Sequence, residues 1–237
     1  MTRLSVNINK IALLRNARGS DIPDLVQFAK DCERYGAQGI TVHPRPDERH
    51  IRRSDVYELK KVVKTEFNIE GYPSPDFLKM VNEVKPHQCT LVPDEPGQLT
   101  SDHGWDTVKH QNLLHEVIAE LKKNNIRTSL FIDPDNNLIE QAKKAGADHI
   151  EFYTGPYAHT FHQDKKEAIK DFIAAAKFCN EINIGINAGH DLNLNNLHFF
   201  KEGIPNLLEV SIGHALVRDC LYYGLENTIQ LYLRALE

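Results

Sequence analysis

The chain has few cysteines and no long apolar segment, and these absences exclude several classes of protein. Its four cysteines are widely separated, and no two of them are spaced as C-x-x-C. This pattern argues against a disulfide framework or a structural zinc site and predicts isolated, mostly buried thiols in a reducing compartment. No run approaches the roughly 18 apolar residues of a membrane span, and residues 1–9 contain only one basic residue. We therefore expect a soluble, cytoplasmic protein with no membrane partner.

The chain also lacks an excess of positive charge. Its 28 lysines and arginines are outnumbered by 33 acidic residues, and they are spread among them rather than clustered. The net charge of -5 gives no broad basic field that would hold a nucleic-acid backbone. A small molecule is therefore the expected partner, and no nucleic-acid partner is predicted.

Two motifs of common α/β enzymes are missing. No G-x-G-x-x-G turn follows the first apolar run, which disfavours an open doubly wound sheet. That run ends in Asn7-Ile8-Asn9, where a barrel metallohydrolase typically has an H-x-H pair, and amides are weak metal ligands. Four further histidines lie in polar segments and are read as surface residues: His110, His115, His159 and His162. We predict no bound metal and keep metal catalysis as a minor alternative.

Short β-rich runs alternate with longer segments of helical period, with no linker between them. This alternation predicts parallel βα units, and eight such units close into a (β/α)8 TIM barrel. The length of 237 residues fits the roughly 200–250 residues of one barrel, so residues 1–237 are expected to form a single domain. The predicted strands are Leu4–Asn9, Gly39–His43, Asn68–Gly71, Gln88–Val92, Arg127–Ile132, His149–Tyr153, Asn183–Asn187 and Leu207–Ile212.

Helix boundaries carry ordinary signals. Ser54-Asp55, Ser74-Pro75-Asp76 and Asp133-Pro134-Asp135 are typical helix starts. Gly36, Gly146 and Gly203 are predicted to end helices just before the following strands.

Polar residues gather at the predicted carboxyl ends of the strands, the rim that hosts catalysis in such barrels. The last two strands are each followed by Gly-His, at Gly189-His190 and Gly213-His214. A titratable imidazole beside a flexible glycine suits acid–base chemistry and phosphate binding. The other candidates are Asn7, Asn9, Lys10, His43, Arg45, Glu70, Thr100 and Glu151.

Several of these residues also have a purely structural interpretation. His43 fits a hydrogen-bonded strand terminus as well as a catalytic base. Glu70 lies in a short central strand, where a buried carboxylate must be paired or functional because an unpaired charge costs several kcal/mol. Glu151 fits a group that supports another buried residue, behind the substrate contacts. The basic loop from Arg45 to Arg53 fits either a solvated approach to a helix or an anion site.

The glycines after the last two strands favour a phosphate site, since the loops after strands seven and eight of barrels often form one. Asp191 complicates this interpretation because its charge repels a phosphate. We expect its side chain to turn away, with Asp191 or Asn193 capping a helix within residues 193–200.

These residues fall into motifs that closely resemble the pyridoxine 5′-phosphate synthase family of vitamin B6 biosynthesis. The resemblance covers essentially the whole chain, and many motifs in the same order make it strong. The motifs are Val6–Gly19, Gly39–Arg45, Arg49–Ile51, Lys85–His87, Leu91–Pro93, Ser129–Asp133, Ile150–Glu151, Tyr153–Gly155, Asn187–His190 and Ile212–His214.

The resemblance implies a barrel enzyme without a cofactor. It implies condensation of 1-deoxy-D-xylulose 5-phosphate with 3-amino-2-oxopropyl phosphate to pyridoxine 5′-phosphate, phosphate and water by general acid–base catalysis. By the same resemblance, His43 and Glu70 match proton acceptors and His190 matches a proton donor. The positions matching contacts to the aminoketone phosphate are Asn7, Arg18, Asp191, Gly213 and His214. Those matching contacts to the deoxyxylulose phosphate are Asn9, Lys10, Arg45, His50 and Thr100.

Two departures from the family pattern stand out. Asn9-Lys10 replaces Asp-His, and Asp191 stands where glycine is expected. We expect retained activity with altered binding. Two other functions stay open: another phosphosugar barrel enzyme, an isomerase or an aldolase whose only candidate Schiff-base lysine is Lys10, and a catalytically silent phosphate-binding scaffold.

The resemblance also implies a homo-oligomer, an octamer in the family. Arg18 lies far enough past the first strand to reach a neighbouring subunit. The last helix, predicted over Leu216–Leu236, has apolar residues on more than one face, which fits either a partner contact or an ordinary final barrel helix. Two loops are candidate lids, Pro93–Asp106 and Tyr157–Lys166, and the second is favoured.

Overall fold

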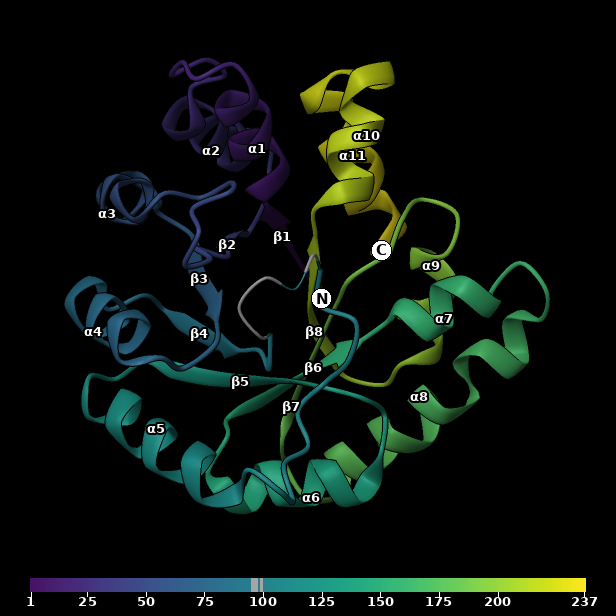
Figure 1. Ribbon diagram of the computed structural model, residues 1–237. Helices are drawn as coiled ribbons and strands as arrows, with labels where there is room; N and C mark the ends of the chain where they lie inside the picture. The colour runs from purple at the N-terminus through teal and green to yellow at the C-terminus, as the bar shows by residue number, and fades with distance from the viewer. Residues whose placement is uncertain (95–97, 99) are drawn as a thin grey trace.

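The computed structural model describes residues 1–94, 98 and 100–237 and contains a closed barrel of parallel strands (Figure 1). Each strand pairs with the next along the chain, and β8 pairs with β1 to close the barrel. The predicted (β/α)8 barrel is thereby confirmed. The strands are β1 (Arg3–Asn7), β2 (Gly39–Val42), β3 (Glu66–Gly71), β4 (Gln88–Leu91), β5 (Arg127–Ile132), β6 (His149–Tyr153), β7 (Gly185–Gly189) and β8 (Leu207–Ile212).

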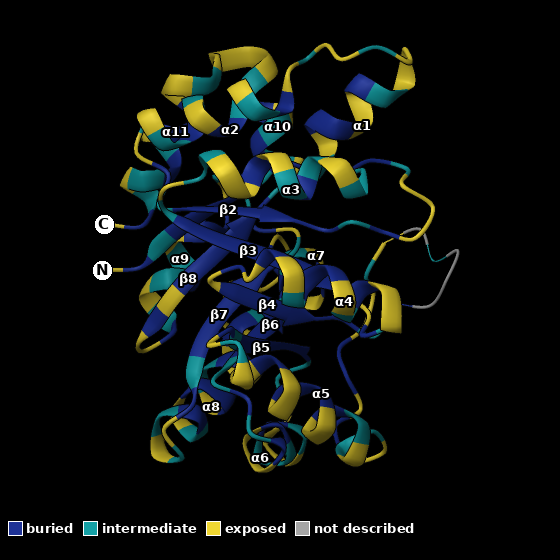
Figure 2. Ribbon diagram, turned by 90° about the vertical axis from the view of Figure 1, so that its left-hand side faces the viewer, coloured by how far each residue is buried: buried dark blue, intermediate teal, exposed yellow. Residues whose placement is uncertain are grey.

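Helices surround the strands and pack their apolar faces against them (Figures 1 and 2). Two of the predicted helix starts are confirmed: Ser74 caps α4 with Pro75 at its first turn, and Asp135 caps α6. The helices are α1 (Asn9–Ala17), α2 (Leu25–Arg34), α3 (Arg53–Val62), α4 (Pro75–Val84), α5 (Gln111–Lys123), α6 (Asn136–Ala145), α7 (Gly155–Thr160), α8 (Lys165–Glu181), α9 (Leu197–Gly203), α10 (His214–Tyr223) and α11 (Leu225–Ala235).

Some predicted boundaries differ from the structure. The strand expected at Asn183–Asn187 begins and ends two residues later, since Asn183 has a φ of +55° and belongs to the turn after α8. The single helix predicted over Leu216–Leu236 is wrong, because Gly224 at a φ of +73° separates α10 from α11. Gly203 is the last residue of α9 rather than a residue beyond its end.

The strands alternate between an apolar outer face and a polar interior. In β3, the side chains of Phe67 and Ile69 belong to the hydrophobic core that the helices cover. The intervening polar side chains meet across the barrel: Thr90 of β4 donates to Glu151 of β6 at 3.4 Å, although these strands are not neighbours. The interior is therefore a hydrogen-bonded network, in contrast to the branched aliphatic layers usual in this fold.

The described residues contain no helix long and apolar enough to cross a membrane. The predicted isolated thiols are confirmed: Cys32, Cys89 and Cys179 are buried, Cys220 is half-buried, and none of the four is in a disulfide.

Candidate active site

A cavity of about 600 Å³ opens at the carboxyl ends of the strands. All but one of the predicted site residues line it, and Arg18 is the exception because it is exposed just beyond the end of α1. The predicted residues that line the cavity are Asn7, Asn9, Lys10, His43, Arg45, His50, Glu70, Thr100, Glu151, His190, Asp191, Gly213 and His214.

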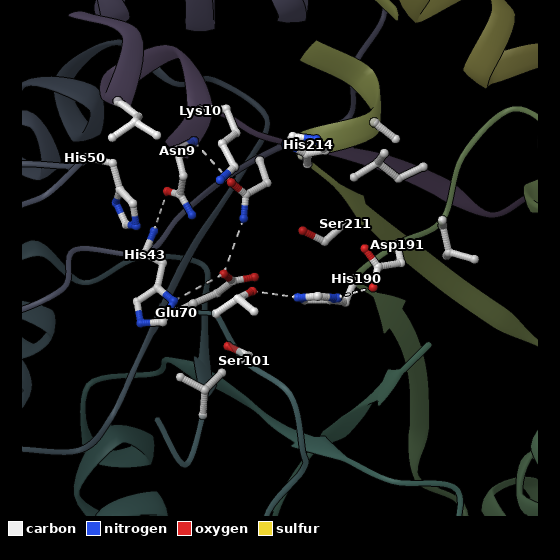
Figure 3. A pocket seen from close by; sticks show the side chains of 18 of the residues that line it. Asn9, Lys10, His43, His50, Glu70, Ser101, His190, Asp191, Ser211 and His214 are labelled. Atoms are coloured by element: carbon white, nitrogen blue, oxygen red, sulfur yellow. Dashed lines mark hydrogen bonds and ion pairs between the residues drawn. The ribbon is translucent and has the colours of Figure 1, made fainter. Parts of the chain in front are cut away.

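His43 and Glu70 face each other in the cavity (Figure 3). The Nδ1 atom of His43 lies 3.9 Å from Oε2 of Glu70, too far for a hydrogen bond. The side-chain amide of Asn7 donates to the same oxygen at 3.3 Å. The structural alternative for Glu70 is an ion pair with an arginine or a histidine, and the structure supplies the histidine: His43 lies at ion-pair distance when it is protonated.

Burial favours the neutral form of both groups. It raises the pKa of Glu70 well above its usual range, and the nearby carboxylates of Glu151 and Asp94 add to the effect. Burial also lowers the pKa of the His43 imidazole well below its usual range, assisted by the positive charge of Arg45. Both pKa shifts favour an uncharged pair, an imidazole with a free lone pair facing a carboxyl group that retains its proton more readily than an exposed one.

Glu151 lies deeper in the barrel and is held by the interior network. Burial raises its pKa to about 7, against the opposing effect of the hydrogen bond from Thr90. Gly189 on the adjacent strand makes room for it, because a Cβ there would lie 2.1 Å from a Glu151 carboxyl oxygen. The Gly189 predicted for a phosphate loop therefore also has a packing role.

The residues at the start of α1 fix the backbone of His43. The side-chain oxygen of Asn9 accepts from the backbone N–H of His43 at 2.9 Å, and the Asn9 N–H donates to Asn7 at 3.1 Å. The amide at position 9 thus acts as a structural link between β1 and β2. Lys10, the next residue, is exposed at the rim of the cavity.

Arg45 is the buried cation of the site. Its guanidinium forms a buried ion pair with Asp94 and donates to the carbonyl oxygen of Gln98 at 3.1 Å. Ser101 donates to the same Asp94 carboxylate at 2.7 Å, so these contacts tie Gln98 and Ser101 to Arg45 and Asp94. Burial and the charge of Arg45 together lower the pKa of His50 to about 4, which leaves its imidazole neutral.

His190 and Asp191 follow β7 and contact each other rather than a helix terminus. The Nδ1 atom of His190 lies 2.8 Å from Oδ2 of Asp191. The prediction that Asp191 or Asn193 caps the next helix is wrong, since Asn196 occupies the N-cap of α9. The Asp191 carboxylate is directed to His190 instead. After β8, Gly213 precedes α10, and the first turn of this helix, including His214, borders the cavity.

Polar residues that were not predicted as part of the site also line the cavity: Ser101, Asn193, Ser211 and Arg218. Arg218 lies four residues, about one helical turn, beyond His214 in α10. Residues at this spacing share one face of a helix, so the helical period could have identified Arg218. Ser211 lies two residues before Gly213, where strand alternation places it on the inner face.

The favoured lid is wrong. Residues expected to form the loop Tyr157–Lys166 instead include most of α7 and the start of α8, and the Tyr157 ring is fully buried, with its hydroxyl bonded to the Asn196 carbonyl at 2.7 Å. Of the other candidate, Pro93–Asp106, residues 95–97 and 99 lie outside the described residues. Within the described residues, no group of three or more His, Cys, Asp or Glu side chains is arranged to hold a metal ion.

The fold and the cavity together define a TIM barrel with acid–base and cationic groups at the carboxyl ends of its strands. The chain matches the family described as "Pyridoxal phosphate biosynthesis protein PdxJ" over residues 4–237, and it belongs to this family.

Named relatives agree with this assignment. The chain is 61% identical over 237 residues to the pyridoxine 5′-phosphate synthase of Cytophaga hutchinsonii, covering all of both chains. It is 59% identical over 236 residues to the protein of the same name from Bacteroides fragilis, again covering all of both chains.

Solved structures of other enzymes share the fold. A thiamine phosphate pyrophosphorylase from Pyrococcus furiosus has a TM-score of 0.64 at 12% identity, covering 99% of this chain and 95% of that one. A 4-hydroxy-2-oxoglutarate aldolase has a TM-score of 0.63 at 16% identity, covering 99% and 94%. At such low identity these likenesses support the barrel alone.

Proposed function

We propose that this protein is a pyridoxine 5′-phosphate synthase that works by general acid–base catalysis without a metal or cofactor. It condenses 1-deoxy-D-xylulose 5-phosphate with 3-amino-2-oxopropyl phosphate to pyridoxine 5′-phosphate, phosphate and water. The family and its named relatives support the reaction. The observation that carries the mechanism is the buried His43 imidazole, with its pKa lowered, 3.9 Å from the buried Glu70 carboxyl, with its pKa raised, in one cavity.

The site contains both groups that can accept protons and groups that can donate them, as this chemistry requires. Joining an amine to a ketone expels water, and aromatising the ring requires C–H protons to be removed. His43 starts as a free base and takes the first proton, whereas Glu70 starts protonated and becomes an acceptor only after giving its proton to a departing oxygen. His190, on the opposite side of the cavity, returns protons to leaving groups (Figure 3).

The two phosphate groups of the substrates have separate cationic regions available. The N-terminus of α10, with Gly213, His214 and Arg218, presents backbone N–H groups and a guanidinium to one of them. Lys10 and Arg45 lie on the β1–β2 side. We assign the first region, with Asn7, to the aminoketone phosphate and the second, with Asn9, His50 and Thr100, to the deoxyxylulose phosphate.

The working enzyme is proposed to be a cytoplasmic homo-oligomer. Buried free thiols suit a reducing compartment. Arg18 does not line the cavity of its own chain, which suits a contact with the substrate bound in a neighbouring copy. Apolar side chains at the end of α10 are strongly exposed: Leu221 at 78%, Tyr222 at 80% and Tyr223 at 52%.

A direct assay tests the reaction. The purified protein is mixed with deoxyxylulose phosphate and freshly generated aminoketone phosphate, without metal or nucleotide, and pyridoxine 5′-phosphate is followed by mass and absorbance. Product is expected with the wild type and with His115→Ala, an exposed histidine on α5. With His43→Ala the rate falls about 10²–10⁴-fold, because the general base is lost.

The opposite results are equally informative. Folded wild-type protein that makes no ring from verified substrates refutes the proposed reaction and indicates another phosphorylated substrate. Full activity of His43→Ala refutes the assignment of this base.

A further inference from the structure

The imidazole of His190 is held at both of its ring nitrogens. Its Nδ1 atom contacts the Asp191 carboxylate at 2.8 Å, and its Nε2 atom contacts the Thr100 hydroxyl at 3.0 Å (Figure 3). The Tyr153 ring packs edge to face against the imidazole, with the centroids 5.3 Å apart. Two directed contacts and one ring contact leave the imidazole little freedom to rotate.

An unusual backbone makes the contact between adjacent side chains possible. Both residues adopt the left-handed region, with φ of +75° at His190 and +58° at Asp191. This conformation is unfavourable for a residue other than glycine and persists only where surrounding bonds impose it. Thr154 donates its hydroxyl to the His190 carbonyl, and the amides of Asn193 and Asn196 donate to the Asp191 carbonyl at 3.2 and 3.3 Å.

The charge on Asp191 determines which nitrogen of the ring carries hydrogen. The hydrogen bond from His190 lowers the pKa of Asp191, so this side chain is an ionised carboxylate at neutral pH. A carboxylate only accepts hydrogen bonds, so Nδ1 must carry the hydrogen. Proton exchange with the substrate then takes place at Nε2, which contacts Thr100 on the cavity side. A hydroxyl accepts or donates equally well, so this contact survives in both protonation states.

We propose that Asp191 is a positioning residue that locks neutral His190 in the Nδ1–H tautomer. Nε2 is then the atom that takes up a proton released in the reaction, forming the imidazolium, and delivers the same proton to the leaving group. The proposal rests on the proposed function, since it takes His190 as the proton donor of that reaction. It replaces the expected substrate contact of the Asp191 side chain with a contact to the donor itself. In the other tautomer Nε2 already carries a hydrogen and has no lone pair with which to take up a proton. Its Nδ1 lone pair then faces the Asp191 carboxylate, which is also only an acceptor.

Two variants remove the lock without threatening the fold. Asp191→Gly suits the left-handed backbone better than aspartate does, because glycine has no Cβ. Asp191→Asn keeps the size of the side chain and tolerates the same backbone, but its amide both donates and accepts and so no longer selects one tautomer.

The first test reads the tautomer directly in the substrate-free protein by ¹⁵N–¹H correlation of the histidine rings. His190→Gln identifies the His190 signals among the twelve histidines. The wild type is expected to show the Nδ1–H form alone, whereas Asp191→Gly and Asp191→Asn show a mixture of both tautomers. An unchanged Nδ1–H pattern in Asp191→Gly overturns the proposal.

The second test separates positioning from substrate binding. Asp191→Gly is expected to lower kcat about 10–100-fold, a part of the usual contribution of a general acid, with KM values for both substrates changed less than about twofold. The kcat of Asp191→Asn is expected to lie between those of Asp191→Gly and the wild type. A raised KM with unchanged kcat identifies Asp191 as a substrate contact and overturns the proposal. The tautomer measurement needs no turnover, so failure of the proposed reaction is distinguished from failure of the Asp191 lock.

Discussion

Burial controls the protonation of the acidic residues inside this barrel. Glu70 and Glu151 lie in strands whose neighbouring residues are apolar, and both are buried at the bottom of the cavity. Desolvation disfavours the charged form, so the pKa of each carboxyl is raised and the site holds protons that it can exchange at neutral pH. The apolar residues around these two carboxyl groups in the sequence identified them as candidates. Their hydrogen-bond and ion-pair partners could be identified only in the folded structure.

Glu151 makes the stability of the protein depend on pH. Its pKa rises from 4.5 in the unfolded chain to about 7 in the folded one. Below pH 4.5 both states are protonated. As the pH rises through about 7, the folded state must give up a proton that the unfolded state has already lost, so the stabilising contribution disappears. Glu151→Gln is therefore expected to gain roughly 1–3 kcal/mol over the wild type between pH 4.5 and 7.5.

The measurement is urea denaturation at several pH values. Glu181→Gln, at an exposed position at the end of α8, serves as the control and should follow the wild type throughout. A constant difference in unfolding free energy between Glu151→Gln and the wild type contradicts the raised pKa.

At the scale of elements, the loop after β4 is anchored by a close backbone contact. A Cβ on Gly104 would lie 2.4 Å from the Ile132 Cα, which is backbone and cannot move aside. The Gly104 N–H donates to Asp133 at 3.0 Å, and the next residue, Trp105, is buried with its indole N–H bonded to the Leu91 carbonyl. The glycine thus lets the backbone at residue 104 pack directly against the carboxyl end of β5.

Gly104→Ala is expected to lower the free energy of unfolding by roughly 1–3 kcal/mol, because the backbone at residue 104 must move away from the end of β5 to make room for the methyl group. Thermal and urea denaturation measure the loss. Gly19→Ala is the matched control: its Cβ meets no atom within 4 Å, and only the backbone conformation at φ +65° opposes it, at about 1 kcal/mol. A smaller loss for Gly104→Ala than for Gly19→Ala argues against the close packing.

Local signals predicted some elements and missed others for a physical reason. Ser74-Pro75 begins α4 as predicted, since a cap and a proline act on the adjacent turn alone. The sequence predicts a loop at Tyr157–Lys166, yet its first residues belong to α7 because Tyr157 packs among Phe161, Phe172 and Phe200. This aromatic cluster joins α7, α8 and α9, so no window of sequence contains it.

At the scale of the whole molecule, the end of α10 presents apolar side chains to solvent. Leu221 and Tyr222 are 78% and 80% exposed in the isolated chain. Burying such side chains against a second copy stabilises an oligomer by about 1.5–3 kcal/mol for each large apolar group. We therefore expect the purified protein to be larger than its 27.0 kDa chain.

Tyr222→Arg is expected to reduce the mass in solution, because a guanidinium there must lose its hydration in the interface. Light scattering coupled to size exclusion measures it. Val108→Arg introduces the same charge at a half-exposed apolar residue elsewhere and should leave the mass unchanged. A wild type that elutes as a 27.0 kDa monomer contradicts the oligomer.

The sequence by itself determined the barrel, because strand and helix periods and their alternation are local properties that repeat along the chain. It also determined which polar residues end the strands, and parallel pairing brings those ends together at one rim. Only the tertiary structure decided the protonation of His43 and Glu70, the contact of Asp191 with His190 and the separation of Arg18 from its own cavity. These properties depend on desolvation and on distances between residues far apart in the chain, which no local pattern encodes.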